Sequence, residues 1–246
     1  MRIKFLGSGD AFCNGGRMNA CILVEIEWKN CKLLLDCGAT AMAALNRFEA
    51  DANEIDMIFI SHLHGDHYAG LPFFLMNARF LKRIKPLYIY GPAGIEKRVK
   101  DTMELFFTDS TKNELPFSIH YHELMSPVEI FEGIGLAPYE VLHKSGAPSL
   151  AFRLKADGKI LGYSGDAEWS PALIDAALDS DLFICECYSY EKNIKNHLNF
   201  QTLDEKRREL KARRIVLTHL GPEMLAMREL IPDSYTVAED GLEIVL

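Results

Sequence analysis

Four candidate metal ligands lie within the six residues His62-Leu63-His64-Gly65-Asp66-His67. Three imidazoles and a carboxylate crowded around one glycine suit a hydrophobic core poorly, but they offer the nitrogen and oxygen lone pairs that bind divalent cations. A catalytic metal site also needs rigid support and an open coordination position for water. The nearly all-apolar segment Ile55–Ile60 precedes the cluster, and we predict that it is a buried strand that provides this support. The cluster therefore indicates hydrolysis at a metal centre.

The spacing of these residues predicts two ions rather than one. His62 and His64 are two positions apart, so in an extended segment both side chains point to the same face and can reach one ion. Gly65 permits a sharp turn, after which Asp66 and His67 can reach a second ion. In two-metal hydrolases the ions lie about 3.5–4 Å apart.

Three further donors each come directly after a predicted strand, namely His143, Asp166 and His219. Donors at strand ends would complete the coordination of both ions at one edge of the sheets. We expect the first ion to be held by three histidines, the second by a carboxylate and two histidines, and Asp166 to bridge them. The two sets are His62, His64 and His143 for the first ion, and Asp66, His67 and His219 for the second.

Alternating strands and helices must position these residues. Apolar and β-branched content predicts strands at Ile3–Leu6, Ala20–Glu27, Lys32–Asp36, Ile55–Ile60, Leu87–Tyr90, Lys159–Tyr163, Leu182–Cys185 and Ile215–Thr218. Helices are predicted at Ala39–Phe48, Ala69–Phe80, Gly94–Phe106, Pro171–Leu178 and Thr202–Ala212. Pro72 would lie in a first helical turn, and Ser170 would cap the helix that starts at Pro171. A strand meander from Ser118 to Leu154 would turn at Gly133 and Gly146. This pattern predicts an α/β or α+β protein, with one domain over residues 1–246.

Composition narrows the class of protein. The chain is 48% hydrophobic and 25% charged, which is ordinary for a globular protein with a large core. No apolar run approaches the roughly 20 residues of a membrane span, and the N-terminal residues do not form an export signal, so we expect a cytoplasmic protein without membrane contact. The six cysteines are then free thiols. A net charge of −8 argues against broad nucleic-acid binding, although two divalent ions would add positive charge where a phosphate needs it.

The motif His62-x-His64-x-Asp66-His67 resembles the signature of the metallo-β-lactamase superfamily. The likeness extends in order through the chain, at Leu6-Gly7-Ser8-Gly9, Leu34-Leu35-Asp36-Cys37-Gly38, His143, Ser164-Gly165-Asp166 and Thr218-His219. The resemblance implies an α+β fold, the four-layer αββα sandwich, with a dinuclear site at one edge between the sheets. It also implies the same assignment of ligands. Zinc suits such a site first, and manganese or iron also fit.

A second resemblance concerns Cys185-Glu186-Cys187-Tyr188 and the segment that follows from His197 to Thr202. Both are similar to ribonuclease Z and the PhnP-type phosphodiesterases, in which one histidine lies beside the scissile phosphate and stabilises the transition state or protonates the leaving oxygen. His197 is the matching position, and the alternative is that it caps the helix near Thr202. The stretch between His143 and Asp166 has no room for the long tRNA-clamping arm of some ribonuclease Z proteins.

These resemblances imply a metal-dependent phosphodiesterase, in which Asp66 orients the attacking water or accepts its proton and His197 stabilises the developing charge. The substrate would be a cyclic nucleotide, another small phosphodiester or an RNA 3′ end. Two alternatives stay open: hydrolysis of a thioester, lactone or β-lactam at the same metal site, and a non-catalytic ligand-binding or sensor protein. A homodimer rests only on analogy with ribonuclease Z.

Overall fold

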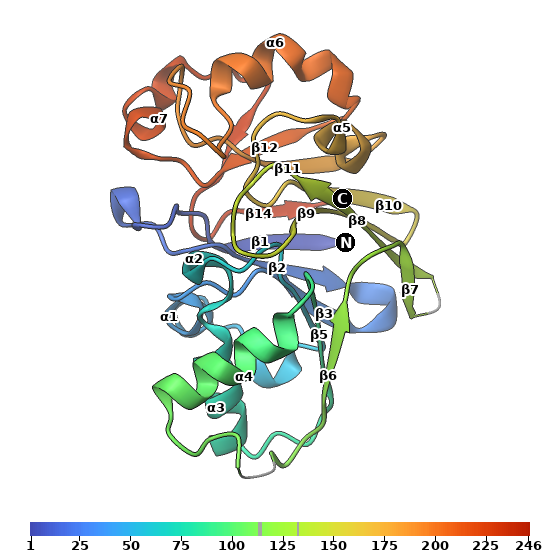
Figure 1. Cartoon of the computed structure of the whole chain (residues 1–246). Helices are drawn as coiled ribbons and strands as arrows, with labels where there is room; N and C mark the ends of the chain where they lie inside the picture. The colour runs from blue at the N-terminus through green and yellow to red at the C-terminus, as the bar shows by residue number, and fades with distance from the viewer. Residues whose placement is uncertain (113–114, 132) are drawn as a thin grey trace.

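The computed structural model describes residues 1–112, 115–131 and 133–246. Within these residues the chain forms two seven-stranded sheets that pack face to face, with helices on their outer sides (Figure 1). The strand order is β14-β1-β2-β3-β4-β5-β6 in the first sheet and β13-β12-β11-β10-β9-β8-β7 in the second. The predicted α+β fold with four αββα layers is confirmed.

The first sheet is built mainly from the N-terminal half of the chain. Its strands are β1 (Arg2–Gly7), β2 (Cys21–Ile26), β3 (Cys31–Leu35), β4 (Met57–Phe59), β5 (Leu87–Gly91), β6 (Ile119–Glu123) and β14 (Glu243–Val245). The α-helices of this half are α1 (Ala41–Arg47), α2 (Gly65–Tyr68), α3 (Leu71–Phe80) and α4 (Ile95–Phe106). Strands β3 to β6 run parallel to one another, so their carboxyl ends share one edge.

The second sheet is built from the C-terminal half. Its strands are β7 (Val128–Phe131), β8 (Ile134–Val141), β9 (Ser149–Ala156), β10 (Lys159–Tyr163), β11 (Leu182–Glu186), β12 (Ile215–Thr218) and β13 (Thr236–Val237). Helices α5 (Pro171–Ala177), α6 (Phe200–Leu210) and α7 (Pro222–Ala226) accompany it, and short 3-10 turns lie at Asn14–Gly16, Glu27–Lys29, Ala52–Glu54 and Arg228–Leu230. The predicted turns at Gly133 and Gly146 are present, both with a left-handed φ of 81°.

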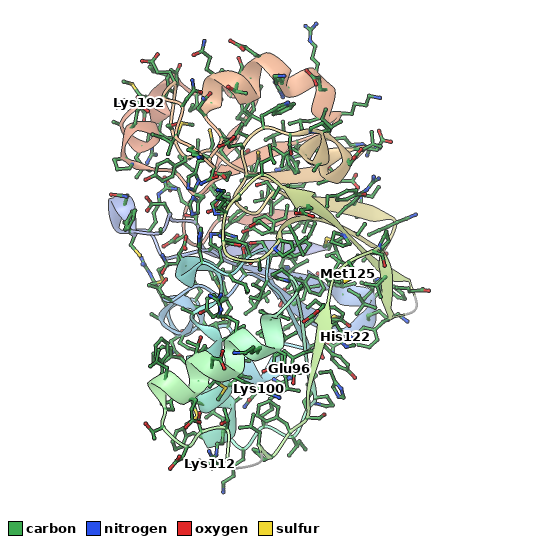
Figure 2. The ribbon with its side chains drawn as sticks, in the orientation of Figure 1. Glu96, Lys100, Lys112, His122, Met125 and Lys192 are labelled. Carbon is green, nitrogen blue, oxygen red and sulfur yellow. The ribbon has the colours of Figure 1, made fainter. Side chains whose placement is uncertain are left out.

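Three hydrophobic layers hold the sandwich together. The central layer lies between the sheets, where Phe59 of β4 meets Phe152 of β9 with ring centroids 6.2 Å apart. The outer layers lie between each sheet and its helices. Helix α4 shows the pattern, because Val99 is buried while Glu96 and Lys100 form an exposed i,i+4 ion pair (Figure 2). The central layer therefore fixes the two sheets against each other.

Some predicted elements are shorter than expected. The segment Ile55–Ile60 is buried but is a strand only at Met57–Phe59, and the helix predicted from Ala69 begins at Leu71, with Pro72 in its first turn as expected. Ser170 does not cap α5, since its buried hydroxyl has no hydrogen-bond partner among the described residues. Gly65 does not use left-handed freedom, because it is simply the first residue of α2.

All six cysteines are free, as expected. In the described part of the chain, no helix combines the length and the apolar character that a membrane crossing requires.

Candidate metal centre

The seven predicted donors gather at one edge of the sandwich. His62 and His64 follow β4, while Asp66 and His67 lie in the single turn of α2. The other three come just after β8, β10 and β12, and these strands point the same way, because β8 and β10 both run antiparallel to β9 and β10 to β12 are parallel. Strand direction thus brings residues from both halves of the chain to one place.

Three imidazoles form the first group. His64 Nδ1 lies 3.2 Å from His62 Nε2 and 3.0 Å from His143 Nε2. Nitrogens that bind one tetrahedral zinc at about 2.0–2.1 Å are separated by roughly 3.3 Å, so these three are spaced as ligands of a single ion. His143 is held in this orientation by its Nδ1, which donates to the backbone carbonyl of Asn196 at 2.7 Å.

The second group combines carboxylates with imidazoles. Asp66 Oδ2 lies 3.2 Å from both His67 Nε2 and His219 Nε2. Asp166 faces both groups: its oxygens lie 3.3 Å from His67 Nε2 and 3.4 Å from His219 Nε2, and 3.8 Å from His62 Nε2. This central position is the one that a bridging carboxylate requires.

Two polar atoms at the centre have no hydrogen-bond partner in the described part of the chain, as expected for metal ligands. His67 Nε2 and Asp166 Oδ1 are buried and make no hydrogen bond within the described residues. Leaving such an atom unsatisfied costs about 1–3 kcal/mol, which coordination would offset. The donor sets, nitrogen-only on one side and mixed nitrogen and oxygen on the other, therefore suit a dinuclear site, and they do not by themselves decide the metal.

The pKa shifts agree with a requirement for positive charge. Burial and the neighbouring charge of His67 hold the pKa of His62 well below its ordinary value, so His62 stays neutral. Burial lowers the pKa of His67, but the carboxylates of Asp166, Asp66 and Asp36 outweigh it and raise the pKa well above the ordinary value. These carboxylates thus favour a nearby cation, and a divalent ion would supply that charge in place of the proton.

Asp36 is a buried residue at the candidate centre that the search for ligands missed. Its buried carboxylate accepts hydrogen bonds from His67 Nδ1 at 2.7 Å, Ser61 Oγ at 2.8 Å and the Tyr163 hydroxyl at 2.6 Å. With Nδ1 occupied, His67 presents Nε2 to the centre. The sequence signal was available, since an aspartate that ends the apolar strand Cys31–Leu35 must find buried partners.

His197 lies beside the centre without belonging to either group. Its Nδ1 is 3.1 Å from Glu186 Oε2, and its ring centroid is 5.1 Å from that of His143. The capping alternative is wrong, because Asn199 Oδ1 accepts the Thr202 N–H at 2.8 Å and caps α6. Glu186 was also missed as a functional residue, although a carboxylate inside the buried strand β11 is a recognisable signal.

A cleft of about 400 Å³ opens over the centre. Asp66, His197 and His219 line its floor, and Phe12, Tyr188 and Ile194 surround them. The Tyr188 ring stacks on His197 with centroids 4.8 Å apart, whereas Phe12 is 78% exposed. Aromatic and aliphatic groups therefore surround a floor of charged and imidazole groups, which suits a ligand with one flat and one anionic part.

Comparison with protein families agrees with this geometry. The model of the family described as "Anti-Pycsar protein Apyc1" matches residues 1–237. The chain belongs to this family. Its fold, and its likeness to ribonuclease Z, a tRNase Z and a PhnP-family protein, confirm the predicted membership of the metallo-β-lactamase superfamily. The likeness places it in the branch of ribonuclease Z and the PhnP-like proteins.

Individual relatives show how far the likeness extends. The chain is 25% identical to ribonuclease Z of Listeria monocytogenes over 98% of its own length and 95% of that protein. It is 32% identical to ribonuclease Z of Methanosarcina acetivorans, but that match spans 63% of the chain and only 48%, about half, of the relative. The solved structure of human tRNase Z, short form, superposes with a TM-score of 0.82 at 26% identity, covering 100% and 99% of the two chains.

A diphosphatase of the PhnP family shares the fold, with a TM-score of 0.74 at 18% identity. Between His143 and Asp166 the chain forms β9, β10 and their turns.

Replacing Asp36 tests the role of its carboxylate. In Asp36→Asn the side chain keeps its shape but loses its charge, so His67 is held less firmly and the affinity for one of two zinc ions should fall about 10- to 100-fold. Isothermal titration of the metal-free protein with zinc measures this. Asp181→Asn, which removes a carboxylate far from the centre, is the control, and equal zinc affinities for the two variants would contradict the assigned role.

Proposed function

We propose that the protein is a metal-dependent phosphodiesterase that acts on a small phosphodiester such as a cyclic nucleotide. The observation that carries this proposal is the His197–Glu186 pair beside the candidate metal centre. A histidine held by a buried carboxylate, next to a dinuclear centre but outside its donor groups, is placed to act on the charge that develops at phosphorus.

The metals would be held by the seven donors as grouped above, with Asp166 between the two ions. Two bound divalent ions would supply Lewis acidity toward a phosphoryl oxygen and lower the pKa of a water so that hydroxide exists near neutral pH. Asp66 turns Oδ2 toward His67 and His219, which leaves its Oδ1 to accept a proton from the attacking water. These residues determine the position and direction of attack.

His197 acts on the phosphoryl group and the leaving oxygen. Because Glu186 occupies Nδ1, the nitrogen that remains for the substrate is Nε2. As an imidazolium, His197 stabilises negative charge on the phosphoryl oxygens and can deliver its proton to the leaving oxygen. Glu186 is in turn fixed by the Ala167 N–H and keeps the imidazole in one orientation.

The shape of the cleft favours a small substrate. A volume of about 400 Å³ is within the usual range for sites that bind one small molecule. The exposed Phe12 ring offers a surface on which a base can stack. An RNA 3′ end is the second candidate, because relatives of the chain are ribonuclease Z proteins.

Two other classes of function have less support. Hydrolysis of a thioester, lactone or β-lactam would use the same centre, but it gives the His197–Glu186 pair no role at phosphorus. A sensor protein without chemistry would not need seven metal donors in place. A panel of lactones and thioesters, assayed beside phosphodiesters, separates these classes.

Removing the imidazole of His197 should reduce phosphodiesterase activity without removing metal. For His197→Ala we expect the rate with bis(p-nitrophenyl) phosphate to fall about 100- to 10,000-fold, the usual contribution of a general acid. Metal content, measured by elemental analysis, should stay unchanged. His122→Ala removes an exposed histidine of β6 and is the control. Equal rates for both variants would show that His197 has no part in the reaction.

Glu186 should determine the pH above which the phosphodiesterase activity falls. Burial lowers the pKa of His197, but the hydrogen bond and charge of Glu186 outweigh burial and raise that pKa above its ordinary value. The imidazolium therefore persists to higher pH, and activity falls as the pH rises through this pKa. Glu186→Gln removes the charge that raises the pKa of His197 most, while burial still lowers this pKa and Asp166 still raises it. The alkaline limb of the kcat profile should therefore move to lower pH. Glu168→Gln, which removes a neighbouring carboxylate that binds the Asn196 N–H, should leave the limb in place.

Phe12 should contribute to binding rather than to chemistry. With a 3′,5′-cyclic nucleotide we expect Phe12→Ala to raise KM about five- to tenfold at constant kcat, because a base loses its stacking surface. Phe80→Ala, which removes a ring 77% exposed on α3, is the matched control. An unchanged KM would place the base elsewhere, and cleavage of RNA 3′ ends without turnover of cyclic nucleotides would favour the second candidate.

A further inference from the structure

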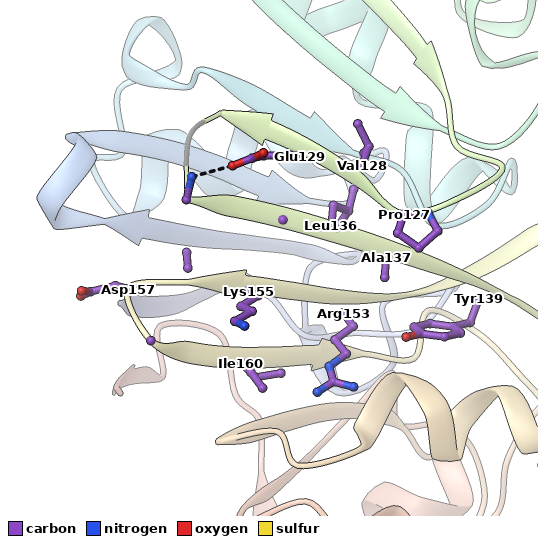
Figure 3. A pocket seen from close by; sticks show the side chains of 14 residues that line it. Pro127, Val128, Glu129, Leu136, Ala137, Tyr139, Arg153, Lys155, Asp157 and Ile160 are labelled. Atoms are coloured by element: carbon purple, nitrogen blue, oxygen red, sulfur yellow. Dashed lines mark hydrogen bonds between the residues drawn. The ribbon is translucent and has the colours of Figure 1, made fainter.

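A second cleft lies on the outer face of the second sheet, and none of the candidate metal-centre residues lines it (Figure 3). Its volume is about 620 Å³. We call it the basic groove and define it by Tyr139, Arg153 and Lys155, with Gly135, Ala137 and Ile160 as its floor. The proposed hydrolysis gives it no role.

Strand register explains why the groove exists. Arg153 and Lys155 of β9 lie opposite Ala137 and Gly135 of β8, so all four residues face the same side. The intervening Leu154 points the other way and is buried in the central layer. Because Ala137 and Gly135 on β8 are small, the long side chains of Arg153 and Lys155 project beyond their neighbours on this face.

Helix α5 covers only part of this face. A side chain at Gly162 of β10 would collide with the Ala176 carbonyl of α5, at 2.7 Å, so the helix backbone rests directly on the sheet there. Gly162 pairs with Arg153, while the next outward position on β10, Ile160, pairs with Lys155. The groove begins where α5 ends, and Arg153 lies at this boundary.

The two cations of the groove are not in ion pairs with described residues. Within residues 1–112, 115–131 and 133–246, no carboxylate lies within 4.0 Å of the Arg153 guanidinium or the Lys155 ammonium. Two carboxylates also line the groove and balance its formal charge, but neither contacts the cations: Glu129 accepts the Gly133 N–H at 3.0 Å, and Asp157 projects away at the far end (Figure 3). A half-buried arginine without a partner is unusual in a chain with a net charge of −8.

We propose that the basic groove binds a nucleotide, with its phosphates on Arg153 and Lys155 and its base against Tyr139. Residues two apart on a strand are separated by roughly 6.6 Å, so the two cations can bind adjacent phosphates. Arginine binds phosphate through its planar fork of N–H donors, and lysine adds a compact charge.

Tyr139 completes the site. It pairs with Ala151, so it is the diagonal neighbour of Arg153 on the same face, and its side chain leans toward Arg153 (Figure 3). A half-buried aromatic ring next to two cations offers a base one face for stacking while the phosphates are held. The volume of the groove suits a single nucleotide.

The test uses α,β-methylene-ADP, whose bridging carbon resists hydrolysis, and the metal-loaded full chain. Isothermal titration should give an affinity for the groove that falls about tenfold or more in Arg153→Gln/Lys155→Gln, because charge-assisted hydrogen bonds are lost. Tyr139→Leu should weaken binding about fivefold or more, because the base loses its stacking surface. Arg79→Gln/Lys82→Gln removes the same charge from the region of α3 and should have no effect.

Two further readouts separate this site from the metal cleft. If both clefts bind the probe, the Arg153→Gln/Lys155→Gln variant should weaken one of the two binding events and leave the other unchanged. Phosphodiester hydrolysis should be unchanged because neither residue touches the metal cleft. Unchanged affinity and stoichiometry in a variant with the wild-type circular dichroism spectrum would overturn the proposal. So would equally tight binding of adenosine, which has no phosphate, or binding of a single-stranded oligonucleotide about tenfold tighter than that of the probe.

Discussion

The buried carboxylate of Asp36 joins the parts of the molecule on which the candidate metal centre depends. It accepts hydrogen bonds from α2 through His67, from the loop after β4 through Ser61, and from the second sheet through Tyr163. A buried carboxylate is stable only when such partners are present, since an unpaired one costs several kcal/mol. The orientation of His67 and the contact between the two sheets near the centre therefore depend on the same side chain.

Close backbone packing supports this arrangement. A side chain on Gly38 would meet the Asp66 carbonyl at 2.1 Å, so only glycine allows the turn after β3 to lie against α2. Asp36 and His219 both adopt left-handed φ angles, 61° and 58°, which cost energy in residues other than glycine. The His219 N–H donates to the Ser8 carbonyl at 3.1 Å, which ties its strained backbone to the loop after β1. Local strain is thus balanced by packing and hydrogen bonds around the centre.

Much of the centre could be predicted from the sequence because its signals are local. Four donors lie in six residues, and the other three each follow a short apolar segment that could only be a strand. A carboxylate in or beside an apolar strand signals burial at Asp36 and Glu186, but their roles depend on partners that are distant in sequence, such as Tyr163 for Asp36. Ser170 has the residue type of a helix cap but makes no capping bond, which the structure does not explain. The basic groove depends on the register of three strands and on where α5 ends, and neither is encoded locally.

The distribution of the donors along the chain has a consequence for folding. Asp66 and His219 are 153 positions apart, and the first group likewise combines residues from both halves. An unfolded chain can offer an ion only the local donors between His62 and His67, because bringing the distant donors together costs conformational entropy that is recovered when both sheets form. Ions bound at this edge would therefore bind the native state selectively and raise its free energy of unfolding by mass action. Metal binding would then stabilise the association of the two halves of the chain.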